Sequence, residues 1–414
     1  MKKKYIIIAA VMILSLTACG NLSGGDIRAD FARGNITDDQ LAELVRNGEI
    51  PQNVTTLVLF GNQISDLSPL SELTSLTSLN LNDNQISNLT PLSGMTSLTW
   101  LDLSDNQIDD LSPLSGLINL TELNLWNNQI SNLSGLSSLL NLTGLWIGGN
   151  QISDLTPLSG LINLTGIRLD MNRISDFSPL SNLTNLKSLF LNHNQISDIS
   201  PLSGLINLTD LYLHANQDDH NIVDITPLSR LTNLNVLWLG KVELDDISAL
   251  RGLTNLRELS FWDIQTGDIS ALANLTNLTS LNMGGDKIDN INIFSNLTAL
   301  TELSFNNSQV SDISPLSDLI NLTSLVLQNN QITDISPLSR LTNLTRLDLS
   351  ANQIHDLTTV SGLTDLTDLR LWGNQVSDLR PLSGLINLQI VDLNGNPVTD
   401  WSPVSHIPDV LGRP

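Results

Sequence analysis

The 414-residue sequence is poor in cysteine, in aromatic residues and in positive charge. Its single cysteine excludes a disulfide bond within the chain. Aromatic residues make up 4% of the sequence, and 19 basic residues stand against 42 acidic ones, which gives a formal net charge of −23. Proteins that bind nucleic acid present a basic patch that displaces counterions from the phosphates. We therefore expect no nucleic-acid partner.

The sequence also lacks the motifs of common catalytic sites. It contains no Ser-His-Asp elbow, no glycine-rich phosphate loop and no H-E-x-x-H sequence. A candidate metal site comprises His193, His214, His220, Asp170, Asp210, Asp218 and Asp219. These residues follow no repeated ligand spacing of the kind that zinc motifs show. The sequence thus predicts a protein that is not an enzyme and holds no metal or cofactor.

The most apolar stretch lies at the amino end and is short. Residues 5–18 read YIIIAAVMILSLTA after three lysines, which is the order of a secretory signal. The stretch is too short to predict a membrane span. Cys19 follows, and the four residues LTAC resemble the bacterial lipobox, whose cysteine is acylated and becomes the new first residue. The alternative is an ordinary signal peptide beside a chance cysteine.

The lipobox resemblance implies a signal peptide at 1–18, lipidation of Cys19 and a glycine-rich flexible tether over 19–34. The mature protein would be held in a membrane by acylated Cys19. Its bulk would then be extracytoplasmic, on a bacterial cell surface.

A 22-residue period accounts for most of the remaining sequence. LVLFGNQISDLSPLSELTSL at 57–76 aligns with LNLNDNQISNLTPLSGMTSL at 79–98, and sixteen such repeats fill 57–398 with one insertion at 218–221. The pattern resembles the leucine-rich repeat, whose unit is a short strand followed by a helical or 3-10 turn. Burying the leucines of one unit releases ~1.5–3 kcal/mol each. Ordering its backbone costs ~1–2 kcal/mol per residue, so single units cannot fold and must stack.

The resemblance implies an α/β solenoid, a right-handed arc with a parallel β-sheet on the concave face and 3-10 turns on the convex face. In each repeat an asparagine is expected to bond the backbone of the bend after the strand; these are Asn62, Asn84, Asn106, Asn128, Asn150, Asn172, Asn194 and Asn216. An aspartate before the turn is expected to cap its N–H groups, with a calcium ladder as the alternative; examples are Asp66, Asp110, Asp154, Asp198, Asp312 and Asp334.

Both ends of a solenoid need covers. Residues 35–56 predict a helical cap, in which Thr37 and Gln40 form a capping box and Gly48 ends the helix. Ile36 and Leu41 are placed to pack as a hydrophobic staple. At the other end, 399–414 is a cap or tail in which Trp401 takes the inward position of the repeat leucines.

Residues 341–362 nearly match LTNLTxLxLxxNQISDISPLSGL, which together with the helical cap resembles the bacterial internalin family over about 30–410. The resemblance implies a surface protein that binds other proteins, often host receptors, through its concave sheet. After Asn396 the sequence departs from the best-known members, because no immunoglobulin-like module or wall-sorting motif follows. Host invasion is therefore not inferred. Intracellular phosphatase regulators share the period, but the lipobox disfavours that class.

Tryptophans gather at positions that alternate with the inward leucines and so face the concave side. Four such positions in each of sixteen repeats make 64 of 414 residues, so about one of seven tryptophans is expected there. Six are found: Trp100, Trp126, Trp146, Trp238, Trp262 and Trp372, joined by Phe60, Phe190 and Tyr212. Exposed aromatic residues at this density are typical of a binding surface.

Five successive repeats carry Trp146, Arg168, Phe190, Tyr212 and Trp238 at one strand position. Arg168 is expected between two rings, held flat by cation–π contact for a carboxylate of the partner. Near this row the repeats of 216–310 are irregular. The asparagine is replaced by Val242, Ile264, Asp286 and Ser308, and the proline by Ala249, Ala271 and Ile293. The irregularity reflects either tolerated decay of the repeat or a change of curvature that shapes the site.

These observations predict a monomer that binds a protein partner, a host or bacterial surface protein, on its concave face. Two alternatives remain. Aromatic rings also stack on sugars, so the ligand could be a glycan, and a rigid solenoid can serve as a structural spacer.

Overall fold

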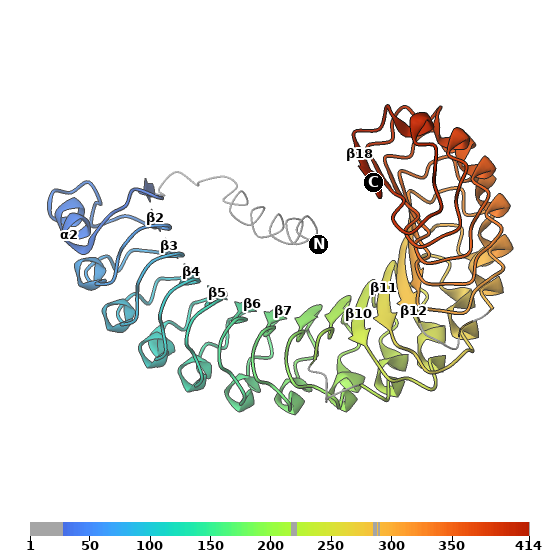
Figure 1. Ribbon diagram of the computed structural model, residues 1–414. Coiled ribbons are helices and arrows are strands. Elements are labelled where there is room, and N and C mark those ends of the chain that lie inside the picture. The colour runs from blue at the N-terminus through green and yellow to red at the C-terminus, as the bar shows by residue number, and fades with distance from the viewer. Residues whose placement is uncertain (1–27, 217–221, 285–287, 289, 414) are drawn as a thin grey trace. The chain divides into compact units, whose positions relative to one another are not determined.

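The computed structural model describes residues 28–216, 222–284, 288 and 290–413. The predicted signal peptide, Cys19 and the insertion at 218–221 therefore lie outside the described residues. The chain divides into two compact units, residues 1–145 and 146–414. In each unit the strands line one side and short 3-10 turns line the opposite side (Figure 1).

The first unit contains the helix that begins the solenoid, followed by short parallel strands. Its elements are β1 (Arg28–Asp30), α2 (Asp38–Arg46), β2 (Thr56–Val58), β3 (Ser78–Asn80), β4 (Trp100–Asp102) and β5 (Glu122–Asn124). Leu57, Leu79, Leu101 and Leu123 are Cα partners across successive strands. The register thus advances by one 22-residue repeat from strand to strand.

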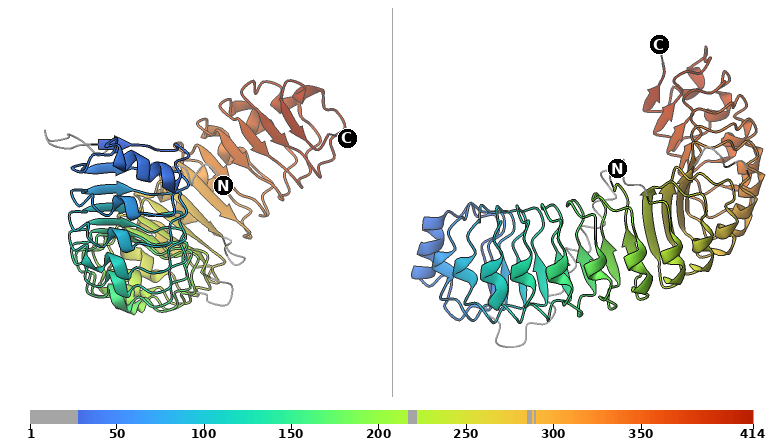
Figure 2. Two further views of the ribbon diagram at one scale, coloured as in Figure 1. Left: turned by 90° about the vertical axis from the view of Figure 1, so that its left-hand side faces the viewer. Right: turned by 90° about the horizontal axis from the view of Figure 1, so that it is seen from below.

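The second unit continues the same pattern. Its strands are β7 (Gly166–Arg168), β8 (Ser188–Phe190), β9 (Asp210–Tyr212), β10 (Val236–Lys241), β11 (Glu258–Trp262), β12 (Ser280–Gly284), β13 (Glu302–Asn306), β14 (Ser324–Val326), β15 (Arg346–Asp348), β16 (Asp368–Arg370), β17 (Ile390–Asp392) and β18 (Asp409–Leu411). The boundary between the units falls within β6 (Gly144–Trp146). Figure 2 shows the turn helices stacked side by side within each unit. The leucine-rich repeat solenoid is confirmed.

The repeat leucines form the core between the strands and the turns. In the first repeat Leu57, Leu59, Ile64, Leu70 and Leu73 are completely buried. The asparagine ladder is also present. Nδ2 of Asn84 donates to the carbonyls of Leu59 and Leu81 at 2.9 and 3.1 Å, and its Oδ1 accepts from the amide of Ile64 at 3.1 Å. Each asparagine therefore joins two consecutive repeats.

A second asparagine ladder was not predicted. Nδ2 of Asn119 donates to the carbonyl of Thr96, 23 residues earlier, at 2.9 Å. The same bond recurs after other turns, at Asn141, Asn185, Asn207, Asn255, Asn277, Asn321, Asn343 and Asn387. The Asn-Leu pair that follows most of the turns carried this signal.

The repeat aspartates cap the turns. Oδ1 of Asp66 accepts from the amide of Ser68 at 2.8 Å, and Asp110 accepts in the same way from Ser112. These bonds lower the pKa of the Asp110 carboxyl, because the backbone and hydroxyl donors of Ser112 stabilise its charged form. The capping role predicted for these carboxylates is confirmed.

The amino-terminal cap follows the predicted pattern, with one correction. Thr37 precedes α2, and the Gln40 side chain accepts from its amide at 2.9 Å, so the capping box is present. Ile36 and Leu41 are both buried. Residues Arg28–Asp30, expected in the flexible tether, instead form β1, which is parallel to β2. The open edge of β2 explains the difference, since its unpaired backbone groups are satisfied by a further strand.

The carboxyl-terminal end also extends the sheet. Strand β18 lies inside the predicted cap or tail and pairs with β17, the strand of the last repeat. Trp401 directly precedes the turn Ser402–Val404, but it is only half-buried, whereas Leu67 at the equivalent position is 1% exposed. Among the described residues no further repeat covers its outer side. Trp401 is therefore a partly exposed end residue rather than a core residue.

The irregular repeats contain the longest strands of the described chain. Strands β10 to β13 have five or six residues, whereas the neighbouring strands have three. Val242 and Ile264 are buried where regular repeats place the asparagine, and Asp286 lies outside the described residues. Without an amide to bond the bend, the backbone continues in the sheet. The register of β10 against β11 shifts between Trp238 and Gly240.

Within the described residues, no helix combines the length and the apolar character needed to span a membrane.

Candidate functional site

Strands β7 to β10 bring four of the predicted site residues into one line. Arg168, Phe190, Tyr212 and Trp238 are Cα partners across successive strands. Their strand neighbours, such as Leu189 and Leu211, are fully buried, so these four side chains point away from the core. We call this set the aromatic row, and the side of the sheet that carries it the strand face.

The rings of the aromatic row pack on one another. Phe190 and Tyr212 are stacked with centroids 4.5 Å apart and planes 6° from parallel. Tyr212 meets Trp238 edge to face at 5.3 Å. Such pairs contribute about 0.5–1.5 kcal/mol beyond the burial of their surface. The rings therefore hold one another in place without a ligand.

Arg168 lies at one end of the aromatic row, and its guanidinium is already held by neighbouring side chains. Its guanidinium carbon lies 4.8 Å from the centroid of Phe190, which confirms cation–π contact with that ring. Its position against the Trp146 ring stays a prediction. Its Nε and Nη2 both lie 3.3 Å from the carboxylate oxygens of Asp170. The expectation that this guanidinium awaits a carboxylate of the partner is wrong, because Asp170 already occupies its bidentate edge.

Asp170 lies below Arg168 and is almost fully buried, with 4% of its side chain exposed. Burial raises the pKa of the Asp170 carboxyl, and the neighbouring Arg168 opposes this effect. The pair holds Arg168 flat against Phe190, and it removes most of the positive charge from that end of the row.

Two histidines adjoin the other end of the aromatic row. The His214 ring lies 5.6 Å from Trp238 and 5.7 Å from His193. Burial, followed by the charge of His193, lowers the pKa of His214 to about 4, so His214 is neutral at pH 7. In the described part of the chain, Nδ1 of His214 is buried and has no hydrogen-bond partner. His214 therefore acts here as a further ring that supports Trp238.

The candidate metal site is not assembled by the described residues. No group of three or more histidine, cysteine, aspartate or glutamate side chains among them could hold a metal ion. His220, Asp218 and Asp219 lie outside the described residues.

The remaining predicted tryptophans lie outside the fully buried core. Trp262 on β11 is 39% exposed, and Trp372 just after β16 is 48% exposed. Trp100, Trp126 and Trp146 are each partly exposed. Trp100 and Trp126 belong to the first unit, whereas the aromatic row belongs to the second. The six tryptophans thus share the strand-face pattern, and their contribution to one binding surface stays a prediction.

Two polar networks near these tryptophans were not predicted. In the first unit, burial raises the pKa of the Asp102 carboxyl, which accepts from the Ser104 hydroxyl at 2.5 Å. In the second unit, Asp368 lies 3.1 Å from Arg370 and 3.8 Å from Arg346. Charged residues at strand-face positions carried this signal, but their partners depend on side-chain directions that the repeat pattern does not give.

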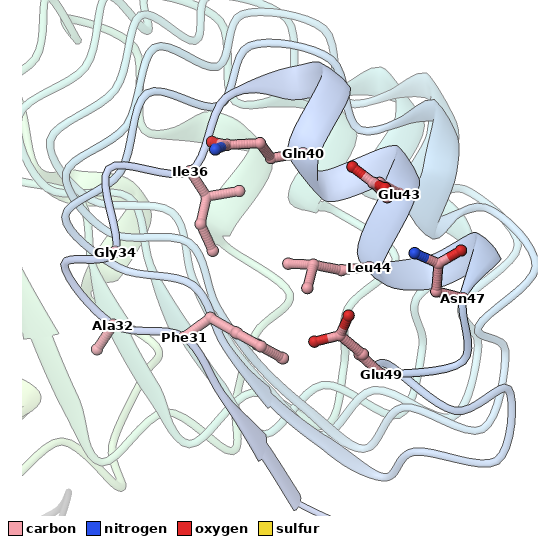
Figure 3. Close-up of a pocket in the computed structure, with 9 residues that line it drawn as sticks. All are labelled: Phe31, Ala32, Gly34, Ile36, Gln40, Glu43, Leu44, Asn47 and Glu49. Carbon is pink, nitrogen blue, oxygen red and sulfur yellow. The ribbon is translucent and has the colours of Figure 1, made fainter.

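A separate surface hollow of about 500 Å³ lies at the amino-terminal cap, between α2 and the segment after β1 (Figure 3). Phe31, Ile36 and Leu44 form its apolar part, and Glu43 and Glu49 lie on its rim. It belongs to the first unit and contributes nothing to the aromatic row.

Comparisons with known proteins agree with the repeat. A family model described as leucine rich repeats (2 copies) matches residues 52–94, 96–138, 140–182, 184–220, 298–339, 320–363 and 364–406. Among curated proteins, no sequence matches this chain.

Three bacterial structures are similar. An internalin (inlF) of Listeria monocytogenes is 31% identical over 85% of this chain and 94% of its own, with a TM-score of 0.58. A leucine-rich repeat protein of Leptospira interrogans is 24% identical over 90% and 99% of the two chains, with a TM-score of 0.78. The functional domain of InlJ from Listeria monocytogenes is 24% identical over 82% and 75%, with a TM-score of 0.63.

The last two similarities show the fold alone. The family model covers more than half of the sequence, and the first internalin is matched over nearly its whole length. This chain therefore belongs to the leucine-rich repeat family, as an internalin-like member.

Proposed function

We propose that this chain is a lipid-anchored, extracytoplasmic protein that binds a protein partner through the aromatic row and the tryptophans that flank it. The observation that carries the proposal is the ordered contact of Arg168, Phe190, Tyr212 and Trp238 on four successive strands. Leucine-rich repeat domains commonly bind proteins, and tryptophan, tyrosine and arginine are enriched among residues that dominate binding energies.

Preorganisation supports this function. Binding costs free energy when side chains lose rotamer freedom, at ~0.5–1.5 kcal/mol for each side chain that becomes immobilised. The stacked Phe190 and Tyr212 and the ion-paired Arg168 already share their conformations with one another. Burial raises the pKa of Tyr212 to about 12, so its hydroxyl stays neutral and can donate to a partner. A partner thus meets a surface that is ordered before contact.

Protein is a better match than glycan because of how the ring faces are used. Sugars stack on free aromatic faces, but the face of Phe190 opposite Tyr212 is covered by the Arg168 guanidinium. Tyr212 in turn lies between Phe190 and Trp238. The row therefore offers mainly ring edges, which suit the mixed apolar and polar surface of a protein.

The test is a double substitution in the aromatic row. Tyr212→Ala with Trp238→Ala should weaken binding of a partner recovered with the full chain by roughly 30-fold or more in Kd, since a single dominant interface residue already contributes ~2 kcal/mol or more. Affinity is measured by biolayer interferometry. Ile386→Ala is the matched control, because Ile386 is 81% exposed and lies outside the strands.

Unchanged affinity in the folded double variant contradicts the proposal and favours a structural spacer. The glycan alternative is favoured if no protein ligand is found and the original chain binds a glycan array while the double variant does not.

A further inference from the structure

Two acidic residues, Asp210 and Glu258, flank Val236 in a line that accompanies the aromatic row two residues earlier in each strand. Asp210, Val236 and Glu258 are Cα partners on β9, β10 and β11. Between this line and the aromatic row stand the buried Leu211 and Leu237, so both lines point to the strand face. Burial, followed by the negative charges of Asp210 and Glu258, raises the pKa of Tyr212.

Strand β11 adds the carboxylate of Glu258 and the indole of Trp262 beside Trp238. Ser260 between them is buried, and its hydroxyl accepts from Nδ2 of Asn282 at 3.3 Å. Glu258, Ser260 and Trp262 alternate with the buried Leu259 and Phe261, so they share the strand face. Ser260 is the Cα partner of Trp238. The aromatic row therefore stops at Trp238, next to a short side chain, with Glu258 on one side and Trp262 on the other. Trp262 lies within β11 itself, because this strand is longer than a regular repeat strand.

Two of the positive charges beside the aromatic row are already paired. Arg168 is bound by Asp170, and Nζ of Lys241 lies 4.0 Å from Asp263. The formal charge of the whole chain is −23. The surface between Tyr212 and Trp262 thus combines aromatic rings with the carboxylates of Asp210 and Glu258, which form no ion pair among the described residues. A cation over an indole is attracted by the ring's electrons, and an arginine can stack on a ring while it donates to a carboxylate.

From these contacts we propose that the partner's segment is basic, and that an arginine or lysine side chain binds over Ser260, between the rings of Trp238 and Trp262 and the carboxylate of Glu258. This inference rests on the proposed function and names the chemistry of the partner. Asp210 extends the acidic surface along Tyr212, where a second basic residue of the same segment would bind. Charge complementarity of this kind chiefly sets partner choice and association rate.

The experiment selects peptides from a random 15-residue library on the full chain and measures their affinities by fluorescence anisotropy. The selected peptides should be enriched in arginine and lysine. Replacing their arginine by citrulline, which removes the charge and keeps the shape, should weaken binding about tenfold. Glu258→Gln should cause a similar loss. It should also make Kd less sensitive to NaCl between 50 and 500 mM, because roughly one charge pair that salt screens is removed.

Glu302→Gln is the matched control. Glu302 occupies the same strand position two strands further along, and it accepts from the Ser280 hydroxyl at 3.3 Å, away from the rings. Circular dichroism confirms that each variant is folded. Binding should be unchanged in this control.

Two different results would contradict the basic partner and the proposed function separately. Peptides that require Tyr212 and Trp238, but lack basic residues and bind Glu258→Gln equally well, contradict the basic partner while the proposed function stands. Peptides that bind the Tyr212→Ala and Trp238→Ala double variant as tightly as the original chain contradict the proposed function itself.

Discussion

At the scale of the residue, the role of a polar side chain depends on the neighbours that the fold places beside it. Arg168 occupies a strand-face position that suggested a contact for a partner, yet Asp170 and Phe190 bind its guanidinium. Asn106 occupies an inward position and bonds the backbone on both sides. Its Nδ2 donates to Leu81 and Leu103, and its Oδ1 accepts from Ile86. One residue stiffens the site, and the other holds two repeats together.

The asparagine ladder makes a stability prediction. Asn106→Ala removes these bonds and leaves buried backbone groups unpaired, at ~1–3 kcal/mol for each group. We expect the free energy of unfolding to fall by about 3 kcal/mol, measured by urea denaturation followed by circular dichroism. Gln107→Ala, at the exposed neighbouring position, should change it by less than about 0.5 kcal/mol. Equal effects of the two substitutions would contradict the role of the ladder.

At the scale of the element, each turn is held by a capping oxygen and not by the charge of the carboxylate. Most repeats use aspartate, but Asn88 and Asn132 accept the same backbone bond at 3.0 and 2.9 Å. The charge matters only for the pH dependence. Hydrogen bonds lower the pKa of Asp110 in the folded chain, so its contribution to stability is complete above its unfolded pKa and is lost as the pH falls through the folded value.

A fourfold exchange of turn aspartates tests this account. The variant replaces Asp110, Asp154, Asp246 and Asp268 by asparagine, and the pKa of each of these carboxyls is lowered by bonds to the serine or threonine two residues later. At pH 6 its urea midpoint should stay close to that of the original chain. Between pH 4 and pH 2.5 its midpoint should fall less, because asparagine does not titrate.

The matching fourfold exchange to alanine should already lose stability at pH 6, because the turn amides lose their acceptors. A fall of the midpoint in acid that is equally steep in the asparagine variant and the original chain would rule out the turn carboxylates as its cause.

The longer strands show an element that the repeat pattern did not predict. Where Val242 and Ile264 replace the asparagine, β10 and β11 extend beyond three residues. Gly240 permits the register shift, because it has a φ of +75° and an added Cβ would lie 2.7 Å from Cα of His214. The choice between tolerated decay and a change of curvature that shapes the site stays a prediction, while the longer β11 includes Trp262 in the sheet.

At the scale of the whole molecule, the proposed anchor and the proposed binding face lie in different parts of the chain. The anchor rests on the lipobox resemblance of residues 16–19, which lie outside the described residues. The aromatic row lies in the second compact unit. Acylation of Cys19 would hold the amino end at a membrane and leave the strand face free to meet a partner.

Replacing the cysteine tests this anchor. Cys19→Ala should abolish incorporation of a radiolabelled fatty acid and move the protein from the detergent phase to the aqueous phase in Triton X-114 partition, because a thiol is required for acylation. Ser23→Ala, in the same segment, should leave both readouts unchanged. Persistent labelling of the Cys19→Ala protein would refute the assignment.

The sequence by itself determined the fold, the face of the sheet to which each strand residue belongs and the ends of α2. Every repeat packs on an almost identical repeat 22 residues away, so the neighbours of Leu57 or Asn84 follow from the period. The tertiary structure alone decided which strand-face residues touch. In the structure Arg168 pairs with Asp170, and Glu258 lies on the same strand face as Trp262. Trp401 is half-buried, and β1 extends the sheet. These outcomes depend on side-chain rotamers and on unmatched strand edges, which vary independently of the repeat.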